Sequence, residues 1–330
     1  MNLKTLASLS FVAALSTAAF AQVSNFDTLN GYASGVDVRL ARARAEMLRA
    51  GRAEGESNLV VSADYINRKV DAAVDSIERS AHGESGRVGY NWRFNEWSVG
   101  AAIGYGNIRT DYNEINSPAP VPLHGYVTAT STEGIVWVGY KSGAWRFSAV
   151  GAVGTTKNKG RRTSDAGSSF ADYDSSDSSF GLTLSREIPV SDALVVEPFV
   201  GLSFASSSTD GFTEQGTSPD RRIVRDFSMD ENRGAIGVRV AGRQSDWTPF
   251  ASVAWLSRFS GGDSNISNTA SNGSNLGVGF VPAASKGLVF VGAGLSGKLD
   301  DNWNVAGTIE YFAGGDERAF GLSLTVGRKF

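Results

Sequence analysis

The 330-residue chain has no cysteine, two histidines, eight prolines and no stretch beyond residue 21 that could cross a membrane as a helix. The absence of cysteine excludes a disulfide framework and thiolate chemistry. A mean hydropathy of −0.15 excludes a helical membrane protein, which would be far more apolar. A net charge of −3 argues against nucleic acid as the main partner. What the chain has in excess is glycine, with 39 residues.

The first 21 residues have the composition of an export signal. Lys4 provides a positive charge, and a nearly uncharged apolar stretch covers residues 5–20. Ala19 and Ala21 fit the small-x-small pattern of a cleavage site. We therefore expect a signal peptide that is cleaved after Ala21. A membrane anchor is the alternative, but the apolar stretch is short for one.

One later segment has the composition of a helix. Residues 36–53 (VDVRLARARAEMLRAGRA) are rich in Ala, Leu, Arg and Glu, which favour helix, and Gly51 and Gly55 mark its expected end. The segment is basic because it carries five arginines, Arg39, Arg42, Arg44, Arg49 and Arg52.

From about residue 57 onward, apolar residues occur at alternate positions. The pattern is clearest in residues 320–326, and it recurs in 303–311, 289–295, 145–153 and 88–94. Alternation is typical of strands with two different faces. A soluble sandwich buries its apolar faces against each other, whereas a membrane barrel turns them toward lipid.

The tight turns distinguish these two architectures. Five of them end in a large apolar residue that begins the next strand, and successive turns are 48 to 56 residues apart. Four of the five residues are tryptophans: Trp97, Trp145, Trp247 and Trp303. A barrel would place them on one rim as a periplasmic aromatic girdle, and a sandwich has no reason to do so. The sequence therefore predicts a transmembrane barrel.

Long polar connections lie between these turns. They cover residues 107–130, 156–175, 205–230 and 260–286. Short turns toward the periplasm and long loops outside are typical of outer-membrane barrels. Eleven strands follow from residue 87, and a first strand at 58–67 completes an even twelve, although 68–79 could be helix instead.

We therefore predict an all-β fold, a twelve-stranded antiparallel transmembrane β-barrel with the N-terminal helix in its lumen. The expected organisation is a signal peptide (1–21), a linker with the helix (22–56) and the barrel (57–330).

The alternation also predicts charges of both signs on the lumenal face. They include Glu187, Glu197, Glu310, Arg93, Arg146 and Arg239. A basic helix could pair with the acids and plug the lumen. In the alternative, these residues line an open pore and pair with one another.

The chain resembles the autotransporter β-domain family, the translocator barrels of type V secretion, over residues 57–330. The resemblance lies in the hairpin GRVGYNWRFNEWSVGAAIGYG, the strands VVEPFVGLSF and WTPFASVAWLSRF, and the ending VGAGLSGKLDDNWNVAGTIEYFAGGDERAFGLSLTVGRKF. It implies a Gram-negative outer membrane, a helix threading the pore, and a C-terminal Phe330 that the barrel-assembly machinery recognises. It also implies periplasmic chaperones and outer-membrane lipid as partners of a monomeric barrel. Only about 35 residues lie between Gln22 and the first strand, which is too short for a folded passenger.

No feature of the sequence indicates an enzyme, a cofactor or a metal site. His82 and His124, the two histidines, both fall in predicted outer loops, and no hydrolase or phosphate-binding motif is present. Asp165, Asp172, Asp174 and Asp177 could suit Ca²⁺, but we favour a solvated loop. We expect translocation or a structural role at the cell surface. The alternatives are a passive, porin-like channel and a surface protein that binds ligands through its loops.

Overall fold

The computed structural model describes most of the chain from residue 59 onward. The described residues are 59–71, 78–113, 124–164, 167–219, 221–242, 246–261, 264–271, 273, 275–281 and 285–329. The predicted signal peptide, the helix 36–53 with its five arginines, and Phe330 lie outside them. Within the described part, no helix is both long enough and apolar enough to span a membrane.

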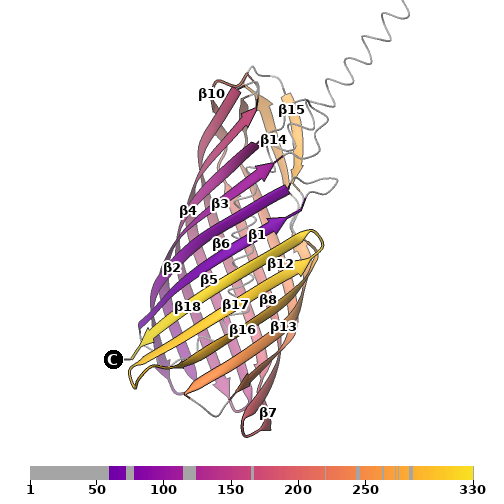
Figure 1. Cartoon of the computed structure of the whole chain (residues 1–330). Helices are drawn as coiled ribbons and strands as arrows, with labels where there is room; N and C mark the ends of the chain where they lie inside the picture. The colour runs from indigo at the N-terminus through magenta and orange to yellow at the C-terminus, as the bar shows by residue number, and fades with distance from the viewer. Residues whose placement is uncertain are drawn as a thin grey trace, which may run out of the picture.

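Twelve antiparallel strands form a closed barrel (Figure 1). They are β1 (Leu59–Val70), β2 (Glu78–Phe94), β3 (Trp97–Asn113), β4 (His124–Ser142), β5 (Trp145–Ser164), β6 (Gly167–Arg186), β8 (Leu194–Thr209), β12 (Phe227–Gly242), β13 (Trp247–Gly261), β16 (Gly287–Lys298), β17 (Trp303–Gly314) and β18 (Glu317–Arg328). Pairing of β1 with β18 and of β6 with β8 closes the cylinder. The predicted all-β, twelve-stranded barrel is thereby confirmed.

The first strand is the one whose extent the sequence leaves open. β1 pairs with β18 from Leu59, opposite Arg328, to Val70, opposite Glu317. Residues 68–70 therefore belong to a strand and β2 begins at Glu78, so the helical alternative for 68–79 is wrong wherever that segment is described. β1 starts beside the end of β18, on the rim that carries the C-terminal end of the chain (Figure 1).

In the half of the barrel that is nearer to the C-terminal rim, each strand has an apolar outer face and an inner face of polar or small residues. Large apolar side chains there are open to the exterior, as shown by Ile103 (73% exposed), Val153 (66%) and Ile236 (62%). A water-soluble sheet would bury such residues, whereas a membrane barrel presents them to lipid. The exposed residues therefore form the lipid-facing band of the barrel.

Above this band the apolar residues change face. On β3 the outer positions become polar at Asn107, Arg109 and Asp111, while the inner residues Ile108 and Tyr112 are buried. Because β3 to β6 continue past the band, the predicted loops 107–130 and 156–175 are largely strand, and this part of the sequence prediction is wrong. These extensions are stable as strands because their inner residues enter an apolar core at the outer end.

The other two predicted loops also contain strands. The β8–β12 connection holds β9 (Phe212–Thr213), β10 (Gln215–Gly216) and β11 (Arg222–Val224), and the β13–β16 connection holds β14 (Ser264–Ala270) and β15 (Asn275–Val281). β9, β11, β14 and β15 form one four-stranded sheet, and β10 pairs with β6. We call this sheet, with β10, the outer cap. It lies at the end of the barrel opposite the C-terminal rim (Figure 1).

Candidate functional site: the barrel interior and the outer cap

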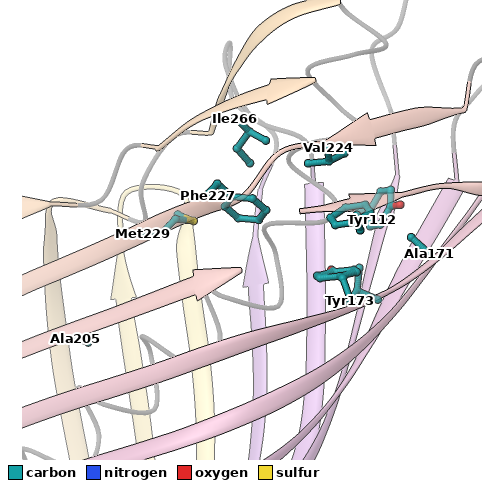
Figure 2. Packing of buried hydrophobic residues seen from close by; sticks show 10 residues of the cluster. Tyr112, Ala171, Tyr173, Ala205, Val224, Phe227, Met229 and Ile266 are labelled. Atoms are coloured by element: carbon teal, nitrogen blue, oxygen red, sulfur yellow. The ribbon is translucent and has the colours of Figure 1, made fainter. Parts of the chain in front are cut away.

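An apolar core joins the outer cap to the barrel wall. The barrel contributes Tyr112, Val127, Ala171, Tyr173, Ala205, Phe227 and Met229, and the cap contributes Phe212, Val224 and Ile266. Figure 2 shows residues of this cluster directed toward one another from the wall and the cap. The rings of Tyr173 and Phe212 stack with their centroids 4.4 Å apart. The outer end of the interior is therefore filled with packed side chains.

Tyr112 is the polar member of this core. Desolvation by burial raises the pKa of its phenol, so the hydroxyl stays protonated at neutral pH. The hydroxyl donates to the backbone carbonyl of Arg161, at 3.4 Å. The core therefore accepts this side chain as a neutral hydrogen-bond donor.

A buried ion pair fastens the cap to β5. Arg162 donates from Nε and Nη2 to the two carboxylate oxygens of Glu214, at 2.7 Å each. Both side chains are at most 2% exposed. Glu214 also accepts the backbone N–H of Arg222 at 2.7 Å. A bidentate pair of this kind fixes geometry strictly, and removing one partner leaves a buried charge.

Two further ion pairs are buried near the outer ends of their strands. Arg68 on β1 pairs with Glu317 on β18 at 2.9 Å, with side chains 3% and 1% exposed. Arg233 on β12 pairs with Glu231 at 2.9 Å and donates to the carbonyl of Ser285 at 2.6 Å. The first pair joins β1 to β18. Through its bond to Ser285, Arg233 joins β12 to the β13–β16 connection.

The predicted lumenal charges lie on the inner register of their strands, and the acids have partners on the wall itself. Arg239 pairs with Glu197 at 2.8 Å, and Ser185 donates to the same carboxylate at 2.5 Å. Glu187 pairs with Arg146 and, at 3.2 Å, with Lys141.

Two predicted residues differ in their setting. Glu310 is buried on the inner face of β17 (1% exposed). Arg93 lies two residues after the inward-facing Asn91, so it shares the inner register, but its side chain is exposed at the periplasmic rim. Sequence analysis missed Asp64, which pairs with Arg87 at 3.0 Å. The alternation in β1 could have predicted this inward position, because Asp64 lies two residues from both Ser62 and Ile66, which are on the inner face.

The four predicted girdle tryptophans begin β3, β5, β13 and β17, and their side chains are exposed on the outer face. These strands all start at the rim where β18 ends. Arginines cover two of the rings, Arg186 at 5.4 Å from Trp145 and Arg328 at 5.1 Å from Trp303. Arg328 interrupts the apolar series of the last strand, and this cation–π contact gives it a place at the interface.

Trp137 is the one tryptophan of the seven that is not exposed on the outer face. Its indole N–H donates to the Asn91 side-chain oxygen at 3.0 Å, on the inner register.

Brominated lipid should distinguish the two faces. We expect it to quench strongly the fluorescence of a variant whose one remaining tryptophan is Trp255, and to quench weakly the fluorescence of a variant whose one remaining tryptophan is Trp137. Fluorescence of the two variants in vesicles measures this, and equal quenching would contradict the assigned faces.

The residues considered for catalysis or metal binding do not converge. His82 lies on β2 and His124 begins β4, so their prediction as loop residues is wrong, and both are exposed. Asp172 and Asp174 face outward on β6, whereas Asp177 is on the inner register and accepts from Thr156 at 2.7 Å. Among the described residues, no group of three or more His, Cys, Asp or Glu side chains could hold a metal ion.

Solved structures with a similar fold include autotransporter translocators. The translocator domain of NalP from Neisseria meningitidis has a TM-score of 0.72 at 15% identity, covering 91% of this chain and 97% of that one. The beta domain of the Bordetella autotransporter Brka has a TM-score of 0.58 at 16% identity (84% and 100% covered). The transport unit of AIDA-I from Escherichia coli has a TM-score of 0.56 at 13% identity (87% and 97% covered). At these identities the likeness shows the fold.

Sequence comparison gives the family. No curated protein is detectably similar to the chain. The family profile described as Autotransporter beta-domain matches residues 59–310, which is most of the chain and nearly all of the barrel. The chain therefore belongs to the autotransporter β-domain family, whose members are outer-membrane barrels.

Proposed function

We propose that the protein is an autotransporter-type translocator barrel, and that its mature role is structural at the cell surface. In this proposal the signal peptide is removed after Ala21 and the segment 36–53 occupies the lumen.

The filled outer end carries this proposal. The core beneath the outer cap takes side chains from β3, β4, β6, β8 and β12 as well as from the cap itself. A passive channel needs a continuous water-filled path, as in large porins. The packed core and the Arg162–Glu214 pair oppose such a path, and they favour a closed barrel over the porin-like alternative.

The start of β1 supports the placement of the N-terminal segment. Leu59 lies opposite Arg328, at the periplasmic rim, so the preceding residues join the barrel at its periplasmic mouth. A helix of 18 residues is about 27 Å long, close to the thickness of a bilayer core. In this proposal the five arginines of 36–53 enter a lumen whose acids Glu197 and Glu187 already have cationic partners on the wall.

The remaining expectations belong to the same proposal. The protein is not an enzyme and carries no cofactor. It works as a monomer, with periplasmic chaperones and the barrel-assembly machinery as its partners during assembly. The separated positions of His82, His124 and Asp177 support the first part, because catalytic groups must lie within reach of one another.

Conductance in planar bilayers tests the proposal. We expect the full-length protein to show low conductance, and a variant lacking 36–53 to stay low as well, because the outer core and the cap still close the outer end. A clear rise in the variant would show instead that 36–53, and not the cap, closes the pore. A steady, large conductance in the full-length protein would contradict the closed barrel and favour the passive channel. Protein lacking 36–53 must first be shown to fold, by its heat-modifiable migration on gels.

A further inference from the structure

A group of cations lies on the outer face of the barrel just above the lipid-facing band. Lys157, Lys159 and Arg161 occupy alternate positions of β5 and are exposed, and Arg109 is exposed on the outer face of β3. We call these four residues the basic patch. On β4, between them, Thr130 lies opposite Lys157 and Thr128 lies opposite both Lys159 and Arg109. Neutral hydroxyl groups thus separate the cations of β3 and β5.

The height of the basic patch follows from the strand geometry. Lys157 comes twelve residues after Trp145, which begins β5 at the periplasmic rim. At about 3.3 Å per residue and a tilt of about 40°, this distance is roughly 30 Å along the membrane normal, whereas the apolar band is about 25 Å tall. The last large apolar residue facing outward on β5 is Val153. The lysine ammonium groups therefore lie where lipid headgroups replace hydrocarbon.

The two lysines are not used in ion pairs with the acids of the neighbouring strand. Lys157 is in register with Asp174 and Lys159 with Asp172. Within the described residues, neither lysine has a carboxylate oxygen within 4.0 Å. Other outward cations differ in this respect. Lys69 pairs with Glu78 at 3.0 Å, and Arg318 pairs with Asp71 at 2.9 Å.

The arginines of the basic patch are held by aromatic rings. The Arg109 guanidinium lies 4.1 Å from the centre of the Tyr126 ring, and that of Arg161 lies 5.7 Å from the Phe170 ring. The cation–π contact of Arg161 uses the flat face of its guanidinium and leaves the N–H edge available to an anion. The N–H edge of Arg109 already donates to Asp111 on the same strand, at 2.8 Å, so Arg109 adds less to the basic patch than Lys157, Lys159 and Arg161.

We propose that the basic patch binds the phosphate groups of the phosphorylated glycolipid in the outer leaflet. Lysine and arginine donate strong, charge-assisted hydrogen bonds to phosphate. The patch continues directly from the surface that contacts the acyl chains, so one lipid molecule can touch both. The inference depends on the outer-membrane location and is independent of whether the barrel exports anything.

Titration of fluorescent, bisphosphorylated lipid A against the folded full-length protein in detergent tests this site. Each cation near an anionic lipid surface contributes roughly a fivefold gain in affinity, so we expect K157Q/K159Q to bind about 25-fold more weakly. K69Q/R318Q is the matched control, since it removes the same charge from outward cations that already have partners. We expect its affinity to change by less than about threefold.

Equal losses in the two double variants would overturn the proposal, because they would show only an effect of net charge. Dephosphorylated lipid A should bind wild type and K157Q/K159Q alike. If it binds wild type as tightly as the phosphorylated lipid, the contact is with sugar or acyl chains and the proposal fails.

A second variant separates lipid binding from a purely structural role. D172N/D174N removes the acids beside the lysines and should tighten lipid binding by a few fold, because it removes repulsion of the phosphates. If the lysines serve only to stabilise β5 against β6, D172N/D174N should instead lower the unfolding temperature and leave lipid affinity unchanged. That result would overturn the proposal.

Discussion

Replacing Arg162 with methionine is expected to open the outer cap. The substitution leaves the Glu214 carboxylate buried without its bidentate partner, which typically costs about 3–5 kcal/mol. Even the lower value corresponds to roughly a 150-fold larger population of the opened cap. The bond after Arg222, a buried residue of β11, should then be cut by trypsin much faster on intact cells.

The double variant R162M/E214Q provides the control. It removes both charges, so a large part of the lost stability should return, and cleavage after Arg222 should slow again. A single variant that is cut no faster than wild type would contradict the role of this pair in holding the cap. Faster cleavage at Lys141, near the periplasmic rim, would instead indicate general unfolding.

The second large effect is expected at Gly100, on the inner face of β3. Gly100 lies directly opposite Trp137 on β4, and an added Cβ would be 2.1 Å from the Trp137 ring. Gly100→Ala must therefore displace the indole and strain its hydrogen bond to Asn91. We expect a loss of about 1–3 kcal/mol in the free energy of unfolding, measured by urea titration in lipid vesicles.

Gly307→Ala is the matched control, because a Cβ there would meet nothing within 4 Å. It should change the unfolding free energy by less than about 0.5 kcal/mol. Gly100→Ala combined with Trp137→Leu should be less destabilised than the sum of the two single changes, since the smaller side chain makes room. Strict additivity would show that the two residues do not compete for this space.

The lipid-facing part of the barrel could be predicted because it depends on short-range patterns. Trp303, Ile309 and Tyr311 face outward on β17 while Glu310 is buried, as their alternation predicts. The even strand number likewise identified 58–67 as the missing strand, and the structure places this strand at Leu59–Val70.

The outer end was predicted poorly because its apolar residues are few and lie far apart in the sequence. Segment 107–130 has a polar average, yet Ile108, Tyr112 and Val127 are all buried on the inner face. The signal was the change of face on β3, from outward apolar residues up to Tyr105 to inward ones from Ile108. An average over the segment conceals this change, and the result was the prediction of a loop.

The sequence by itself determined the strands of the lipid-facing band, the periplasmic turns and the lipid-facing side of each strand. Each of these is a local property, since a strand that separates two media must alternate, and a tight turn is encoded within a few residues. Only the tertiary structure decided that the outer end is closed. Arg162 and Glu214 are 52 residues apart. Phe212 stacks on Tyr173 beyond the end of the β6–β8 pairing, and Ile266 joins the same core from the β13–β16 connection. These contacts depend on how the connections fold over the outer end, which no local pattern encodes.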